Sequence, residues 1–309
     1  MKKFKRVSAV VLGIALLFSP LAPQSVAEAK VIWGNQELVK GQIGRITVLK
    51  NTNLYAIKNN KLVAVRKVTK GQVFRAYSYS SKFGGLYGVS KDTYAQKSSS
   101  IKYEKAPSDK VQALGVTVTK KSLASNISYP QVSGLINKPF EASYNRKFAN
   151  IAKEVQQENK ELKELEKEDR KNGWSVGPYY QNMKYSVPYN QDNILSVAVT
   201  NDMYSGGAHG MAWIDTYNYD LLKARQINLK DIINNNTKLN KVNKYIRDQM
   251  IARNKKGAQF EVNEFKSVNL KEDQFYYTSG GIVIIFGEYE YGPYSNGINT
   301  FKISSSLYK

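Results

Sequence analysis

One apolar stripe constrains the fold of this chain more than any other feature. Pro139 suits the first turn of a helix, because its missing N–H group would have no intrahelical partner there. Large apolar side chains follow at spacings of four, four, three and four residues: Phe140, Tyr144, Phe148, Ile151 and Val155. Such spacing predicts a helix with one apolar face, which must be covered by another layer. The stripe weakens through Leu162 and Leu165, and Gly173 is a natural stop.

The residues around this helix predict a mixed domain over residues 110–309. Leu239, Val242, Ile246 and Met250 indicate a second helix, which closes at Gly257. Runs rich in β-branched and aromatic residues predict strands at 116–119, 126–132, 179–188, 193–201, 211–219, 275–278, 282–286 and 298–303. Because helices alternate with groups of adjacent strands, the expected fold class is α+β, an antiparallel sheet packed by two helices.

Residues 31–106 predict a separate, small all-β unit. Short strand-like runs lie at 43–49, 62–68, 72–79 and 86–89. Turn signals such as Asn59-Asn60 and Phe83-Gly84-Gly85 separate them. Strands at this spacing predict a small barrel. Ala106-Pro107-Ser108 then forms a linker to the second unit.

The first 29 residues have the pattern of an export signal. Basic residues lie within residues 2–6, an apolar segment follows at 7–18, and Ala27-Glu28-Ala29 supplies small residues before Lys30. An uncleaved membrane anchor is the alternative, but the apolar segment is shorter than the roughly 20 residues of a span. We therefore expect residues 1–29 to be a cleaved signal peptide and the protein to be secreted, with no stable membrane span afterwards.

Cysteine is absent and the formal net charge is +21. Without disulfides, exported domains must be stable through their cores alone, as in many Gram-positive surface proteins. The positive charge favours polyanionic surroundings. For an exported chain, peptidoglycan-associated anionic wall polymers are better candidates than nucleic acid. Solubility of a lysine-rich surface is the alternative explanation.

The glycine-rich segment 201–211 contains the only histidine of the chain, His209. A histidine between glycines could act as a general base for Ser205 or bind a metal. One histidine without cysteine argues against a zinc site, so no metal, cofactor or catalytic residue is expected. In the alternative, Gly206 and Gly207 allow a tight turn while His209 bonds across it. Tyr204, which precedes this turn, is taken as a binding residue with these three.

A second loop, residues 287–297, alternates two carboxylates with tyrosines. Glycoside hydrolases use a pair of carboxylates. Glu288 and Glu290 are two residues apart and would share a face of a strand, which is too close for an acid and nucleophile pair. Tyrosine rings can instead stack on sugars or anchor a protein partner. A third interpretation is an acidic edge that resists aggregation. The expected binding residues of this loop are Glu288, Tyr289, Glu290, Tyr291 and Tyr294.

Several motifs in order resemble one family of bacterial extracellular domains. These are Ile127-Ser128-Tyr129-Pro130, residues 193–197, 204–210, 217–221 and 227–231, and the closing loop 287–297. The resemblance covers residues 110–309 and is to the domain shared by the anti-sigma factor RsiV and the deacetylase PdaC. Residues 66–77, 85–89 and 101–103 resemble bacterial SH3-like wall-associated modules. Together they imply a rigid α+β binding domain joined to a wall-associated module.

The family resemblance implies binding of a lysozyme outside the cell. Signalling is not expected to carry over, because only six residues precede the apolar segment of the leader. Nor is deacetylation, since that metal site needs two histidines. The preferred function is therefore a secreted, cell-wall-associated, non-enzymatic binding protein for peptidoglycan or anionic wall polymer, with a lysozyme-like protein as a further partner. The alternative is a peptidoglycan- or glycan-modifying hydrolase that uses carboxylates and His209.

Overall fold

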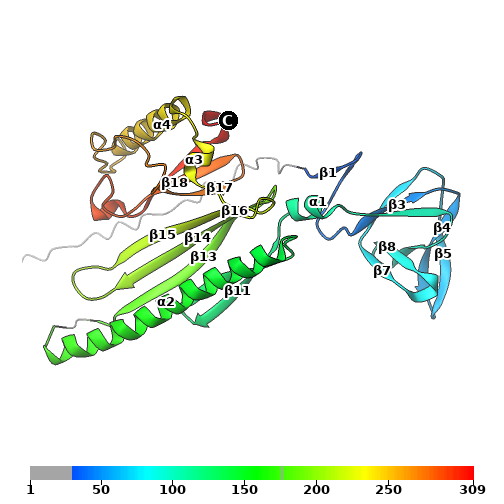
Figure 1. The fold of residues 1–309 in the computed structure, drawn as a ribbon, viewed down its shortest axis with the longest axis horizontal. Coiled ribbons are helices and arrows are strands. Elements are labelled where there is room, and N and C mark those ends of the chain that lie inside the picture. The colour runs from blue at the N-terminus through cyan, green and yellow to red at the C-terminus, as the bar shows by residue number, and fades with distance from the viewer. Residues whose placement is uncertain (1–29, 175–176) are drawn as a thin grey trace, which may run out of the picture.

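The computed structural model describes residues 30–174 and 177–309, so the expected signal peptide lies outside the described residues. An N-terminal group of β-strands lies at one end, and a short helix connects it to a larger layered part (Figure 1). The larger part contains two sheets and two long helices. The described chain is thus mixed α+β, with most of its regular structure in sheets, which confirms the expected fold class in outline.

The N-terminal part contains a two-stranded hairpin, a three-stranded sheet and a five-stranded sheet. The hairpin pairs β1 (Ile32–Trp33) with β2 (Gln36–Glu37). The three-stranded order is β10 (Ile101–Lys105), β3 (Gly44–Val48), β6 (Val73–Ala76). The five-stranded order is β5 (Lys61–Val68), β4 (Thr52–Lys58), β9 (Thr93–Gln96), β8 (Leu86–Ser90), β7 (Ser78–Ser80). A 3-10 turn, η1 (Lys82–Gly84), precedes β8.

Within residues 30–105 these pairings form separate sheets and no closed barrel, so the expected SH3-like barrel is not confirmed. The predicted strand 72–79 is divided at Tyr77, whose N–H donates to the Gly88 carbonyl at 2.9 Å. On either side of this point, β6 belongs to one sheet and β7 to the other. Their common core contains Ile46, Val48, Leu54, Val68, Ala76, Tyr87 and Ala95.

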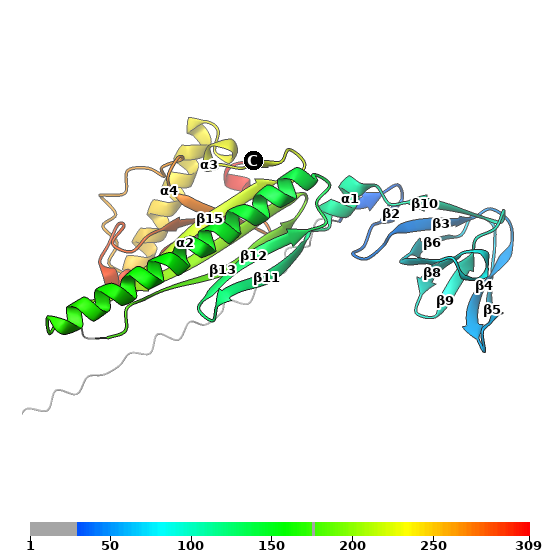
Figure 2. The same ribbon diagram turned by 60° about the horizontal axis from the view of Figure 1, so that its bottom comes forward.

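The expected linker is partly helical. α1 (Ser108–Ala113) begins after Pro107. Its buried Gln112 donates to Asn193 Oδ1 at 3.1 Å and accepts from the Ile136 N–H at 2.9 Å. The Asp192 N–H donates to the Ala113 carbonyl at 2.8 Å. These bonds attach the N-terminal part to one end of the central sheet, where β13 turns into β14 (Figure 2).

The central sheet has six strands. Their order is β11 (Thr117–Ala124), β12 (Ile127–Ser133), β13 (Tyr180–Gln191), β14 (Ile194–Tyr204), β15 (Met211–Asp220), β16 (Arg225–Gln226). All neighbours are antiparallel except β12 and β13, which run parallel. The expectation of a purely antiparallel sheet is therefore corrected. Parallel neighbours need a crossover connection, and α2 (Lys138–Lys171) supplies it.

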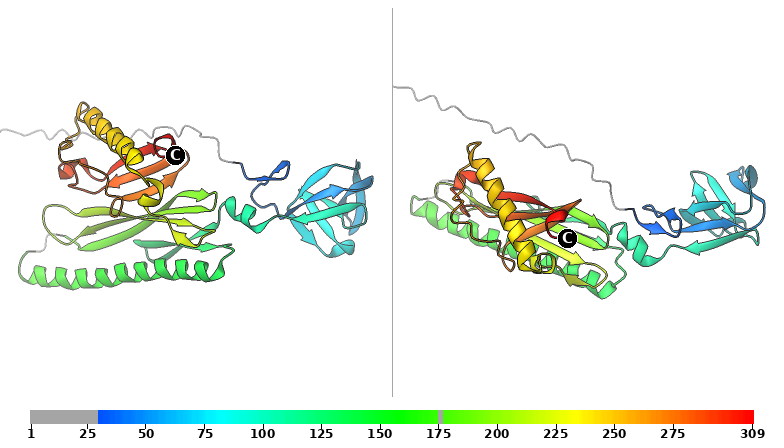
Figure 3. Two further views of the ribbon diagram at one scale, coloured as in Figure 1. Left: turned by 45° about the horizontal axis from the view of Figure 1, so that its top comes forward. Right: turned by 90° about the horizontal axis from the view of Figure 1, so that it is seen from above.

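α2 covers one face of this sheet with the stripe read from the sequence (Figure 3). The Asn137 side chain caps its start by accepting from the Phe140 N–H at 2.9 Å. Tyr144, Phe148, Ala152 and Val155 are buried against Leu195, Val197 and Val199 of β14 and against Tyr219 of β15. Gly173, with φ of +74°, follows the helix as expected. Burial of the stripe explains why the first part of this helix lies on the sheet.

The second sheet of the large part has three antiparallel strands and its own helix. The strands are β17 (Gln274–Thr278), β18 (Gly281–Phe286) and β19 (Asn299–Ser304), in that order. α4 (Asn236–Asn254) packs on them through Val242, Ile246 and Met250. Three short helices complete it: α3 (Leu229–Ile232), η2 (Tyr294–Asn296) and η3 (Ser305–Leu307). The predicted strands thus form two sheets, each with one long helix, rather than one sheet with two.

Polar side chains of the central sheet bind the free edge of β17. Asn218 Nδ2 donates to the Phe275 carbonyl at 2.7 Å, and Thr216 Oγ1 accepts from the Phe275 N–H at 3.1 Å. Ser196 Oγ accepts from the Tyr277 N–H at 2.9 Å and donates to Asn218 Oδ1. Because side chains alternate along a strand, these three lie on the face opposite α2. The C-terminal sheet is therefore joined to the central sheet through its edge.

We predict that Asn218→Ala lowers the free energy of unfolding by about 1–3 kcal/mol, because it leaves the buried Phe275 carbonyl without its donor and the Ser196 hydroxyl proton without its acceptor. Asn218 is only 2% exposed. Urea unfolding measures the change. Asn182→Ala is the matched control, since within the described part of the chain its amide bonds only to the Asp202 carboxylate on the same sheet. Equal losses in the two variants would contradict a special role for Asn218.

Candidate functional site

The two loops singled out in the sequence converge on one surface. Tyr289 Oη lies 2.9 Å from His209 Nε2. The rings of His209 and Tyr294 stack at 3.9 Å between centroids, with planes 18° apart. Tyr289 and Tyr294 lie 5.6 Å apart by the same measure. Residues about eighty positions apart thus form one aromatic cluster, which we call the His209 cluster: His209, Tyr289 and Tyr294.

Both ring nitrogens of His209 have partners. Nδ1 lies 2.8 Å from the Gly210 carbonyl, which can only accept, so Nδ1 carries a proton. In the neutral ring, Nε2 then accepts the hydroxyl proton of Tyr289. Among the described hydrogen bonds of His209, none reaches Ser205, the nucleophile considered in the sequence. The geometry orients the ring as a fixed surface group.

Tyr289 and Tyr291 have left-handed backbones, with φ of +62° and +60°. Such conformations are costly for a non-glycine residue and persist only where the surroundings hold them. Tyr291 points inward and meets Phe286 and Phe265 edge-on, at 5.0 and 5.3 Å between centroids. Tyr289 points outward and is 58% exposed. Both tyrosines were expected to bind a ligand. Tyr289 is exposed to solvent, whereas Tyr291 packs inward and holds the loop in place.

Tyr204, Gly206 and Gly207 shape the first loop. Tyr204 Oη donates to the Gly207 carbonyl at 3.0 Å, and its ring meets Tyr179 edge-on. Gly206 has φ of +99°, and a Cβ there would lie 2.5 Å from Tyr179 Oη. Tyr179 Oη itself donates to Asp169 near the end of α2 at 2.7 Å. The loop is thereby fixed to the helix, with His209 exposed beyond it.

The two carboxylates of the second loop accept backbone N–H groups. Glu288 Oε2 accepts from Ala212 at the start of β15 at 3.1 Å, which ties the two loops together. Glu290 Oε2 accepts from Gly287 within its own loop at 2.8 Å. Burial raises the pKa of Glu290 against the lowering effect of that bond. Both glutamates thus help to hold the loop in shape.

A cleft of about 370 Å³ lies beside this loop and was not recognised in the sequence. Its lining includes Glu290, Glu272, Asp273 and Trp213. Burial raises the pKa of Asp273 to about 6, and the neighbouring Glu290 and Glu272 carboxylates add to the rise. Asp273 directly precedes β17, and Glu290 lies in the loop that follows β18. The pairing of β17 with β18, in which Gln274 lies opposite Ile285, brings the two acids to the same end of one hairpin, and β15 adds Trp213 to the cleft.

An apolar groove runs between α2 and the same end of the central sheet. Leu162 and Leu165 of α2 line it together with Met203 and Trp213. Two helix carboxylates, Glu158 and Glu161, belong to the same lining. The weak continuation of the helical stripe was the only signal for this groove in the sequence. Exposed apolar and aromatic side chains at this end of the sheet include Leu165, Tyr180, Met211 and Tyr289.

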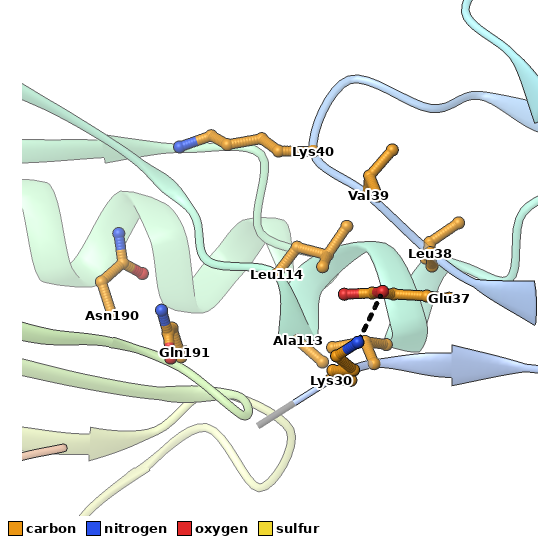
Figure 4. Close-up of a pocket in the computed structure, with 10 residues that line it drawn as sticks. Lys30, Glu37, Leu38, Val39, Lys40, Ala113, Leu114, Asn190 and Gln191 are labelled. Carbon is orange, nitrogen blue, oxygen red and sulfur yellow. Dashed lines mark ion pairs between the residues drawn. The ribbon is translucent and has the colours of Figure 1, made fainter. Parts of the chain in front are cut away.

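A further cavity, of about 410 Å³, lies at the junction of the N-terminal part and the central sheet. Lys30 and Glu37 form an ion pair of 3.3 Å in it, and Asn190 and Gln191 contribute from β13 (Figure 4). Gln191 pairs with Ile194, whereas Tyr180 pairs with Tyr204 at the other end of the same two strands. The junction cavity and the His209 cluster are therefore at opposite ends of the sheet.

Two family models match segments of the larger part. Residues 116–212 match the model described as deacetylase PdaC. Residues 230–306 match a protein family of unknown function, DUF3298. The chain thus contains a PdaC domain, which ends just after the first loop, and a DUF3298 domain, which contains the second loop. The matches support the PdaC part of the expected resemblance; the RsiV part and the SH3-like module are not confirmed.

No curated protein matches the chain. Two crystal structures of DUF3298-family proteins resemble part of it. The protein from Bacteroides fragilis has 19% sequence identity and a TM-score of 0.47, over 62% of this chain and 89% of its own. The protein from Pseudomonas aeruginosa has 13% identity and a TM-score of 0.38, over 62% and 90%.

Within residues 30–174 and 177–309, no helix combines the length and apolar character needed to cross a membrane. In the same described ranges, no group of three or more histidine, aspartate or glutamate side chains is arranged to hold a metal ion.

We predict that Asp273→Asn raises the thermal midpoint at pH 7.5. The folded pKa of about 6 lies above the ordinary 3.8, so folding favours the protonated carboxyl. Its stabilising contribution is complete below about pH 4 and is lost as the pH rises through about 6. Asparagine avoids this loss and keeps an oxygen for the Asn269 N–H. The gain should shrink at pH 5.

Thermal unfolding monitored by circular dichroism at both pH values measures this effect. Asp248→Asn, at an exposed carboxylate on α4, serves as the control and should change little. An Asp273→Asn midpoint equal to that of the wild type at pH 7.5 would show that the cleft does not disfavour the charged form.

Proposed function

We propose that this protein is a secreted, cell-wall-associated binding protein without enzymatic activity. Its N-terminal module and positive charge hold it to peptidoglycan or anionic wall polymer. Its larger part presents the loops around the His209 cluster to a glycan or to a lysozyme-like protein. The single observation that carries the proposal is the convergence of these two loops into one fixed, exposed aromatic surface.

The chemistry of the loops supports binding over catalysis. Both nitrogens of His209 are engaged, and Glu288 and Glu290 accept backbone N–H groups. Exposed tyrosine rings held in one conformation lose little entropy when they meet a sugar or a protein surface. The left-handed backbone at Tyr289 is the kind of strain that often marks a binding loop.

The arrangement along the sheet supports two simultaneous contacts. The N-terminal module is attached where β13 turns into β14, and the His209 cluster lies at the far end of these strands. A wall polymer held by the module would therefore leave the cluster free for a second ligand.

One observation favours the hydrolase alternative. Asp273 and Glu290 share a cleft, and burial raises the pKa of each. A carboxyl group whose pKa burial raises toward neutral pH can serve as a general acid. The second candidate function is therefore hydrolysis of a wall glycan in this cleft.

The proposed wall association predicts that the chain without residues 1–29 sediments with purified Gram-positive walls. This binding should fall as salt rises, because screening weakens the attraction between exposed charges. Absence of binding at every salt concentration would exclude wall association.

A second experiment tests hydrolysis. The same mixtures, made with labelled peptidoglycan, should release no soluble fragments. Fragments that disappear in Asp273→Asn or His209→Ala would replace binding with hydrolysis.

The proposed binding of a lysozyme-like protein predicts that the same chain binds lysozyme in a titration. Tyr289→Ala should weaken this binding by about tenfold or more, as the loss of a central aromatic contact commonly does. Tyr79→Ala, which removes a similarly exposed ring from the N-terminal module, is the control and should leave the affinity unchanged. If the wild-type chain does not bind, the lysozyme partner is excluded. If both variants bind like the wild type, the His209 cluster is not the contact surface.

A further inference from the structure

The N-terminal module contains a long stretch without negative charge. Residues 38–91 include eleven lysines or arginines and no aspartate or glutamate. A stretch of this length with charges of one sign creates a positive potential over its surface. Its position in the fold decides which of these cations face solvent together.

Five of the cations lie on the β4–β5 hairpin and the turn after it, and all five are exposed: Lys58, Lys61, Arg66, Lys67 and Lys70. Among the described residues, none of the five has an ion-pair partner, whereas Arg45 of the same module pairs with Glu104 at 3.1 Å. The hairpin therefore presents uncompensated charge.

The tip of the hairpin concentrates this charge. Lys58 and Lys61 are direct cross-strand partners. They flank Asn59 and Asn60, whose φ of +48° and +56° form a tight two-residue turn. Like charges directly opposite each other on a sheet repel. An anionic group placed between the two ammonium groups would turn this repulsion into attraction.

The rest of the hairpin is also uncovered. β5 is the outer strand of the five-stranded sheet, and Val63 and Val65 are 39% and 47% exposed. An open, partly apolar edge could pair with a strand of another copy, but the same lysines would face each other in that contact. An anionic partner avoids the repulsion. Exposed stems of Lys61 and Lys67 offer it apolar contact as well.

The shape of the hairpin favours a linear polymer over a lipid surface. Its tip is Lys-Asn-Asn-Lys, and the exposed apolar side chains lie behind the tip, along the strand. A hairpin that enters a bilayer needs apolar groups at its tip. β5 has eight residues and so spans roughly 25 Å, enough for several charged repeats. Lysine binds phosphate as a compact point charge without a fixed geometry.

We propose that the β4–β5 hairpin is the surface on which the N-terminal module binds a linear polyanion with repeated phosphate groups. This inference rests on the proposed function, in which the module holds the protein to anionic wall polymer, and assigns the contact to one hairpin.

The test compares two variants of the chain without residues 1–29, each with four charges removed. The hairpin variant carries Lys58→Gln, Lys61→Gln, Arg66→Gln and Lys67→Gln. The control carries Lys230→Gln, Lys241→Gln, Lys255→Gln and Lys256→Gln, all exposed and on the C-terminal part. The probe is long-chain inorganic polyphosphate, titrated across a salt series.

The hairpin variant should bind polyphosphate at least tenfold more weakly at low salt. Its slope of log affinity against log salt should fall by about 3, at roughly 0.7 per lost phosphate contact on a single chain. The control variant should keep most of the wild-type affinity and most of the wild-type salt slope. Equal losses in the two variants would overturn the assignment, since net charge alone would then explain binding.

A double variant, Lys58→Gln with Lys61→Gln, guards against misfolding. It removes the like-charged pair, so its thermal midpoint should not fall, and its affinity should lie between those of the wild type and the hairpin variant. An affinity equal to that of the wild type would exclude the tip. Phosphatidylglycerol vesicles test a lipid surface as the ligand. If the hairpin binds these vesicles more tightly than polyphosphate, the proposed linear polyanion is wrong and the ligand is a lipid surface.

Purified walls separate this inference from the proposed function. If the hairpin binds polyphosphate but the wild-type chain does not bind walls, the proposed function fails and the hairpin site stands. If walls retain the wild-type chain and both four-site variants equally, wall association stands and the hairpin is not its contact.

Discussion

Side-chain hydrogen bonds to the free edge of β17 are the interaction on which the larger part of the structure depends. Ser196, Thr216 and Asn218 take the place of a neighbouring strand and satisfy backbone groups that would otherwise be buried without partners. They also set the position of the C-terminal sheet along β15. The contacts of Glu288 with Ala212 and of Tyr289 with His209 require that position. The arrangement of the two loops around His209 thus depends on the polar side chains of β14 and β15 that bind the edge of β17.

Local features of the fold could be predicted from the sequence, whereas non-local ones could not. The stripe from Phe140 to Val155 and the turn at Asn59-Asn60 each specify one element through neighbouring residues, and both are confirmed. The division of strands into two sheets and the parallel pairing of β12 with β13 depend on contacts between distant residues. The point at which the chain passes from one sheet to the other, at Tyr77, is also non-local, because only the hydrogen bond to Gly88 shows it. β4 was missed because its residues Thr52 and Asn53 resemble a loop.

The candidate site shows the same division. Glycine, tyrosine and carboxylate patterns indicated both loops, and the structure brings His209, Tyr289 and Tyr294 together. The sequence could not show which tyrosine of the second loop points outward, because the left-handed backbone at Tyr289 and Tyr291 breaks the alternation expected of a strand. Nor could it relate Trp213 to Asp273 and Glu290, since the packing of β15 beside β17 depends on contacts between distant residues.

The length of β14 has a mechanical consequence. This strand has eleven residues and so measures roughly 35 Å, with the N-terminal module joined near one end and the histidine loop following the other. A twisted sheet backed by a long helix bends little over such a span. The sheet therefore acts as a stiff spacer that holds the His209 cluster at a fixed distance from the N-terminal module.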